Sequence, residues 1–208
     1  MNPKKLTLAI MMGALGNVLF LFSYVVGQIA PGVSFDFSLI AVLIAGLYGG
    51  PIAGITAGAI AGLLPGLMYG PLGTGGVLGL IGLPVGKALT GLTIAILSQF
   101  LNIHQRNHAS IITIPTTLAS YIPEGVFTYI YFSFLLPLFM EQQIGTAIIA
   151  TIMIKAIVEV MIMSFIMAAL IGNKGFHDFI KTHFVRTNTN RENQKTMETL
   201  ALLVLRQE

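Results

Sequence analysis

Long apolar segments separated by short polar ones dominate this sequence. A straight helix needs about 20 apolar residues to cross the hydrocarbon core of a membrane. The pattern predicts six such spans, and prolines at 115, 123 and 137 predict kinks in the fifth, because proline removes a backbone hydrogen bond. The predicted spans cover residues 6–26, 37–49, 51–68, 76–101, 111–138 and 144–171. We therefore expect an all-α integral membrane protein, with a six-span helical bundle over 1–172 and a polar cytoplasmic tail over 173–208.

Composition supports this interpretation. Hydrophobic residues make up 55% of the 208 positions and charged residues only 9%, whereas soluble domains carry about 25% charge. The sequence has no cysteine, which excludes disulfides and thiolate chemistry. The net charge of +3 comes from scattered basic residues without a binding motif, so no nucleic-acid partner is expected.

The basic residues predict an orientation. With six spans, both termini lie on the same side of the membrane. Five basic residues then lie on that side too: Lys4, Lys5, Arg106, Lys174 and Lys181. The opposite loops, about 27–36, 69–75 and 138–143, contain no lysine or arginine. Because cytoplasmic loops are enriched in basic residues, we expect both termini to be cytoplasmic.

Glycine recurs at every fourth position through the second and third spans. A period of four drifts about 40° per step around a helix, so we expect the glycines not to form one flat stripe. Small residues permit close helix contact in lipid, which leaves two interpretations: packing within the chain, or a smooth face for a partner helix. The glycines concerned are Gly46, Gly50, Gly54, Gly58, Gly62, Gly66 and Gly70.

Four ionisable residues lie inside predicted spans: Lys87, Glu124, Lys155 and Glu159. At 1.5 Å per residue they reach similar depths, about 16 to 22 Å from a membrane face. Lys155 and Glu159 are four residues apart, so they share a helix face. Charges in a membrane usually face a bundle interior or a wet cavity. The four form either internal salt bridges or a pocket for a small charged or zwitterionic solute.

Polar and aromatic neighbours extend this candidate solute site. Tyr121, Thr128 and Tyr131 lie on the Glu124 face of the fifth span, and aromatic rings beside hydroxyl groups suit a planar polar solute. The outer loops are rich in glycine and proline, which favour turns. We assign Asp36, Tyr69 and Thr74 to these loops as candidate gate residues, although Asp36 also fits a cap for the second span.

Motifs for catalysis are not found. Residues 82–88 approach a Walker A loop, but the spacing is one residue short and Ala88 replaces the required Ser or Thr. His104 and His108 are four apart, but two loop histidines without a third ligand are typical of solvated residues. We expect no enzyme activity, no cofactor and no metal site.

The chain resembles the substrate-binding S components of energy-coupling factor (ECF) transporters. The resemblance rests on the small-residue-rich first span, from Lys4 to Ala14, and on residues 35–67, which look like the second and third spans of that family. It covers about residues 1–172. The sequence begins Met1-Asn2-Pro3 and lacks the histidine-bearing N-terminus of the nickel and cobalt members, which argues against a metal substrate.

The resemblance implies a mechanism. An S component captures a vitamin or related micronutrient from outside, in a pocket built from the last three spans and the outer loops. It docks through small residues on the first spans, here Ala9, Gly13, Gly54 and Gly58, to a membrane coupling subunit driven by two cytoplasmic ATPases. This implies a multi-pass protein in the plasma membrane of a prokaryote. The alternatives are a stand-alone proton-coupled secondary transporter or channel, and a membrane enzyme using Glu124 or Glu159.

Overall fold

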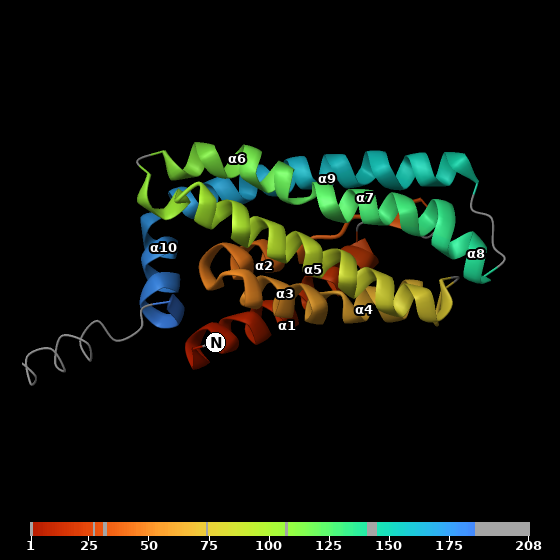
Figure 1. Cartoon of the computed structure of the whole chain (residues 1–208), viewed down its shortest axis with the longest axis horizontal. Helices are drawn as coiled ribbons and strands as arrows, with labels where there is room; N and C mark the ends of the chain where they lie inside the picture. Colours follow the sequence, from red (N-terminus) through yellow and green to blue (C-terminus); the bar gives the residue numbers. More distant parts are fainter. Residues whose placement is uncertain are drawn as a thin grey trace, which may run out of the picture.

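The computed structural model describes residues 2–26, 28–30, 33–73, 75–106, 108–140 and 145–185, and it is a helical bundle (Figure 1). One small antiparallel hairpin, β1 with β2, follows the first helix. The α-helices are α1 (Pro3–Val26), α2 (Ser38–Ile44), α3 (Pro51–Ala61), α4 (Leu63–Tyr69), α5 (Gly76–Phe100), α6 (Ala109–Ser120), α7 (Ile122–Ile130), α8 (Leu136–Met140), α9 (Thr146–Gly172) and α10 (Lys174–Ile180). The remaining elements are strands β1 (Gln28–Ala30) and β2 (Val33–Ser34), the π-helical segments η1 (Ala45–Gly49), η3 (Tyr131–Leu135) and η4 (Lys181–Val185), and the 3-10 helix η2 (Ile103–Gln105).

Five helical segments in the described part of the chain are long and apolar enough to cross a membrane. Large apolar side chains are exposed on them, as at Val18, Phe100 and Phe165, and lipid is the environment that such surfaces fit. The all-α membrane class is therefore confirmed. The five segments are Pro3–Val26, Pro51–Tyr69, Gly76–Phe100, Ala109–Phe139 and Ile149–Gly172.

The expected second span is a short helix inside the bundle. Segment Ser38–Gly49 is apolar but only about 18 Å long at 1.5 Å per residue, and nearly all of its residues are buried. It ends at Gly50, whose φ of +89° suits glycine, and Pro51 then starts α3. Since this helix is shorter than the hydrocarbon core of about 30 Å, a count of six complete spans stays a prediction.

Four of the seven ladder glycines form one line of contact between α3–α4 and α5. A Cβ atom on Gly54 would collide with the backbone of Gly91, and one on Gly58 with the backbone at Lys87. Further along, Gly62 lies against Pro84 and Gly66 against Leu80. The whole ladder is not one flat stripe, because Gly50 breaks it between η1 and α3 with a φ of +89°. The four glycines stay in contact with α5 because a neighbouring helix that crosses at an angle follows the i+4 ridge.

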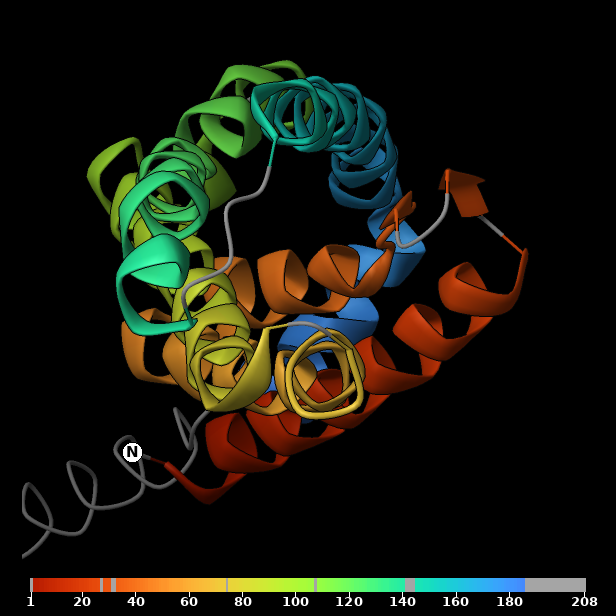
Figure 2. The same ribbon diagram turned by 90° about the vertical axis from the view of Figure 1, so that its right-hand side faces the viewer.

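The remaining helices complete the bundle around this contact. Figure 2 shows α1 outside α3 and α4, with α6 and α9 on the far side. Helix α6 packs along α9, and α5 lies between α3 and α7. The fifth expected span is broken into α6, α7, η3 and α8. The break between α6 and α7 is a turn at Tyr121, two residues before Pro123.

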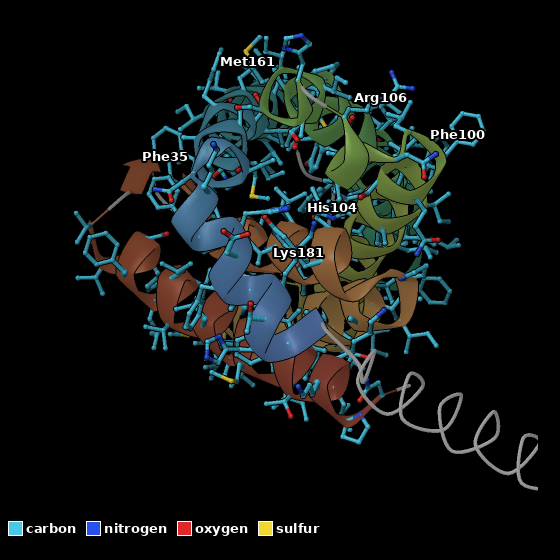
Figure 3. The ribbon with its side chains drawn as sticks, turned by 90° about the vertical axis from the view of Figure 1, so that its left-hand side faces the viewer. Phe35, Phe100, His104, Arg106, Met161 and Lys181 are labelled. Atoms are coloured by element: carbon cyan, nitrogen blue, oxygen red, sulfur yellow. The ribbon has the colours of Figure 1, made fainter. Side chains whose placement is uncertain are left out.

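The start of the polar tail packs on the bundle. Helix α10 follows α9 after Asn173, whose side chain accepts a hydrogen bond from the Phe176 amide. Ile180 is 2% exposed and belongs to the apolar core, with Phe176 and Phe184 packed against it. Figure 3 shows α10 across one end of the bundle. Residues 186–208, including the apolar stretch 197–205, lie outside the described residues.

Candidate functional site

Lys87 is the centre of a buried polar contact. Its side chain on α5 is only 5% exposed, and its Nζ lies 2.5 Å from Oδ2 of Asp36 and 2.6 Å from Oγ of Ser38. The other oxygen of Asp36 accepts a hydrogen bond from the Ser38 amide at 2.9 Å. Asp36 therefore accepts a hydrogen bond from the first amide of α2 and neutralises a lysine on another helix.

A second ion pair lies on α9. Nζ of Lys155 is 3.0 Å from Oε1 of Glu159, one helical turn away. The same carboxylate oxygen accepts a hydrogen bond from the backbone amide of Asp36. The two ion pairs are thus joined through Asp36, which connects α2, α5 and α9.

Glu124 lies on the first turn of α7 and faces α5. Its Oε2 accepts a hydrogen bond from the hydroxyl of Thr90, a residue that is fully buried. A Cβ on Gly86 would come within 3.4 Å of Cγ of Glu124. Neither ion pair found among the described residues includes Glu124. Two internal salt bridges among the four intramembrane charges would have left Lys87 to pair with Glu124. It pairs with Asp36 instead.

The aromatic positions line the same side of the α7 segment. The ring of Tyr131 packs on Gly82 of α5, and its hydroxyl is near Gly75. This hydroxyl is buried and has no hydrogen-bond partner among the described residues. Tyr121 lies close enough to Glu124 and Glu159 to interact electrostatically.

The candidate gate residues lie in different surroundings. Asp36 is in the ion-pair network described above. Tyr69, at the end of α4, packs its ring edge-on against Phe20 and near Tyr24 of α1. Thr74 lies outside the described residues. Their role as a gate stays a prediction.

The candidate docking residues contact the chain itself. Ala9 is fully buried, and Gly13 lies against Ile60 of α3. Gly54 and Gly58 are used in the contact with α5. These four positions serve packing within the chain, and their contact with a partner stays a prediction.

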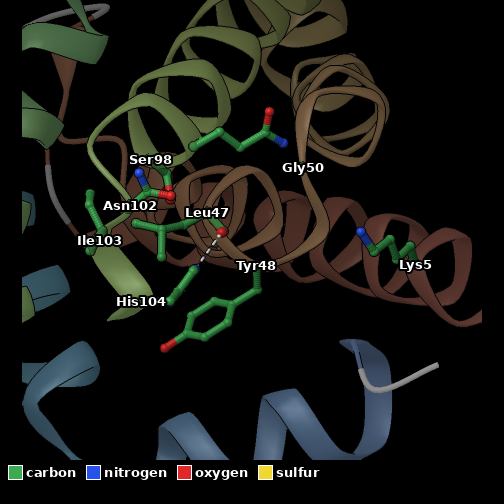
Figure 4. A pocket seen from close by; sticks show the side chains of 9 residues that line it. Lys5, Leu47, Tyr48, Gly50, Ser98, Asn102, Ile103 and His104 are labelled. Atoms are coloured by element: carbon green, nitrogen blue, oxygen red, sulfur yellow. Dashed lines mark hydrogen bonds between the residues drawn. The ribbon is translucent and has the colours of Figure 1, made fainter. Parts of the chain in front are cut away.

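A cavity of about 210 Å³ opens at the end of the bundle near α10 (Figure 4), and its lining includes Lys5, Ser98 and His104. The His104 Nε2 lies 2.9 Å from the Leu47 carbonyl oxygen. A neutral ring must donate here, and burial lowers the pKa of this imidazole. From Asp36 to Tyr48 the chain rises about 18 Å, so this cavity is separate from the charged site.

The hydroxyl of Tyr48 bonds Nδ1 of His177 on α10 at 3.0 Å. The Tyr48 ring also packs 4.9 Å from the ring of His104. Burial lowers the pKa of His177 as well. His104, which was expected to be solvated, therefore belongs to a packed cluster that holds α10 to the bundle.

Three functional groups of the charged site were missed by sequence reasoning. Asp36 was expected in an outer loop, and its ion pair with Lys87 was not predicted. The hydroxyls of Ser38 and Thr90 were not considered. Ser38 does follow Asp36 by two residues at a helix start, a spacing typical of capping. No periodicity in the sequence signals the contact with Lys87 or the bond from Thr90 to Glu124.

The fold and site define a helical membrane protein with a charged cluster buried between its helices. Residues 4–171 match the family described as ECF transporter, substrate-specific component. The chain belongs to this family, so it is a membrane component of a transporter and acts in transmembrane transport. Comparisons with curated proteins and with solved structures give no match.

Proposed function

We propose that this chain captures a small charged or zwitterionic vitamin or micronutrient outside the cell. The observation that supports this proposal is that five ionisable side chains from four parts of the fold come together. They are Asp36, Lys87, Glu124, Lys155 and Glu159. Buried charges are costly in a membrane and usually mark a solute pathway. A solute with complementary charges would bind among these groups, with Tyr121, Thr128 and Tyr131 beside it.

Delivery would require partners. As in the family, a membrane coupling subunit and two cytoplasmic ATPases would supply the energy, and this chain carries no complete ATP-binding motif of its own. Because Gly13 and Gly58 are occupied within the chain, the coupling subunit would contact exposed positions beside them. Ile10 and Ile55 are exposed on α1 and α3, and Ala14 is exposed one turn after Ile10 on α1.

We also infer that the protein resides in a prokaryotic plasma membrane with both termini in the cytoplasm. Lys4, Lys5 and Lys181 support this orientation through the enrichment of basic residues in cytoplasmic segments. The chain has no cysteine, so single-cysteine variants report topology directly. An impermeant maleimide added to intact cells should label Leu72→Cys and should not label Asn173→Cys.

Native mass spectrometry of the protein, gently extracted from its source membrane, tests the proposed function. We expect co-purification with a second membrane subunit and two ATPases, and a bound solute of a few hundred daltons. At least one of Lys155→Ala and Glu124→Ala should weaken solute binding at least tenfold, whereas the exposed control Lys174→Ala should not.

Two results would contradict the proposal. Unchanged affinity in both Lys155→Ala and Glu124→Ala would remove the assignment of the charged cluster as the binding site. Uptake into liposomes by the chain alone, driven by a pH gradient without ATP, would favour a stand-alone secondary transporter.

A further inference from the structure

The charges of the candidate site do not cancel. Three carboxylates, Asp36, Glu124 and Glu159, lie with two ammonium groups, Lys87 and Lys155. All five are close enough to interact electrostatically. With every group ionised the cluster carries one excess negative charge. Such a charge is expensive at membrane depth unless a cation or a proton accompanies it.

The excess charge belongs to Glu124. Each lysine is already paired, Lys87 with Asp36 at 2.5 Å and Lys155 with Glu159 at 3.0 Å. Within the described part of the chain Glu124 has a neutral hydroxyl, that of Thr90, as its hydrogen-bond donor. Both lysines act on Glu124 electrostatically, but among the described residues it has no ion pair of its own. Leaving a buried carboxylate without a close cation is strongly destabilising, so Glu124 is the group that lacks an ion-pair partner.

A second group without a partner lies on the same helix face. Tyr131 is seven residues after Glu124, two helical turns and about 10 Å along the axis. Gly86 contacts Glu124 and Gly82 contacts Tyr131, one turn apart on α5. Tyr131 is 7% exposed, and its hydroxyl has no partner among the described residues. Buried polar groups of this kind usually receive a hydrogen bond from a ligand or water.

We propose that the captured solute carries a positive charge. Its cationic group binds the carboxylate of Glu124, with the ring of Tyr121 nearby, where a cation–π contact adds attraction. A hydrogen-bonding group at the other end of the solute reaches the hydroxyl of Tyr131. This inference rests on the proposed function and narrows its substrate class.

An anionic solute fits the same site less well. It would need the ammonium of Lys87 or Lys155, and both are occupied. If the anion displaced Asp36 or Glu159, a second carboxylate would be left unpaired beside Glu124. The anion's own charge would also add to the excess negative charge of the cluster. A cation adds no such cost and removes the existing one.

Binding to a charge-matched panel tests the inference. The full-length chain in lipid nanodiscs would be titrated with thiamine as a cation, riboflavin as a neutral probe, and biotin and pantothenate as anions. In parallel, the solute released from protein purified from its source membrane would be identified by mass spectrometry. We expect the bound compound to be cationic.

Variants of Glu124 and Tyr131 test which side chains bind the solute. Glu124→Gln keeps size and hydrogen bonding but removes the charge, and should reduce cation affinity at least tenfold. Glu124→Asp keeps the charge and should retain binding within a few-fold, which also controls for folding. Tyr131→Phe should weaken binding about fivefold without changing the preference for cations.

The outcomes separate this inference from the proposed function. Binding of an anionic or neutral solute, or full affinity in Glu124→Gln, would overturn the inference and leave solute capture intact. Absence of a released solute, together with no binding of any probe, would contradict the proposed function and with it this inference.

Discussion

The ammonium of Lys87 lies 2.5 Å from the carboxylate of Asp36, although 51 positions separate the two residues. This ion pair fixes the segment before α2 to the middle of α5. Because Asp36 also donates its backbone amide to Glu159, the pair organises the whole charged cluster.

Asp36→Asn should lower thermal stability by removing the charge that neutralises Lys87. Leaving a buried charge unpaired costs about 3 to 5 kcal/mol, and partial exposure of Asp36 at 21% places the expected loss at the lower end. Thermal unfolding in nanodiscs measures it. Combining Asp36→Asn with Lys87→Met should cost less than the two single changes together, and strict additivity would refute direct pairing.

Gly58→Ala should destabilise the bundle, because the new Cβ would collide with the backbone of α5 at Lys87. Overpacking of this kind costs about 1 to 3 kcal/mol. Gly145→Ala is the matched control, since no atom of the described residues lies within 4 Å of a Cβ there. Equal melting temperatures for the two variants would show that α3 and α5 do not meet as closely as described.

Acid should weaken the attachment of α10. Burial lowers the pKa of His104 and His177 below the ordinary value near 6.5, so the unfolded chain binds more protons there. The stability contributed by the neutral rings is fully present above about pH 6.5 and is lost as pH falls through the lowered pKa values.

Thermal unfolding at a series of pH values from 7.5 downward checks this. His104→Gln should flatten the decline, while the exposed His108→Gln should leave it unchanged. An unchanged or steeper decline in His104→Gln would show that other groups cause the acid sensitivity.

Tyr131→Phe should affect the free and the solute-bound protein in opposite directions. The hydroxyl is buried without a described partner, and its removal should stabilise the free chain by up to about 1 kcal/mol. Solute affinity should fall, because the bound solute loses a hydrogen bond. Melting temperatures with and without solute give both effects, and a destabilised free chain would mean that the hydroxyl already has a partner.

Two features of the molecule follow from the sequence alone. The membrane class follows from hydropathy, and the contact of Lys155 with Glu159 follows from their i,i+4 spacing on one helix. The Lys87–Asp36 pair does not, because no periodicity relates a loop to a helix 51 residues away. The course of the glycine ladder depends on the crossing of two helices, which the drift of a single helix does not reveal.

The short buried helix formed by α2 and η1 touches both polar regions of the protein. Ser38 at its start bonds Lys87, and Tyr48 near its end bonds His177. Close-packed interiors transmit strain. A solute that displaced Asp36 would therefore also displace Tyr48, which holds α10 through His177. The helix therefore connects the charged cluster to the histidine cluster at α10 through Ser38 and Tyr48.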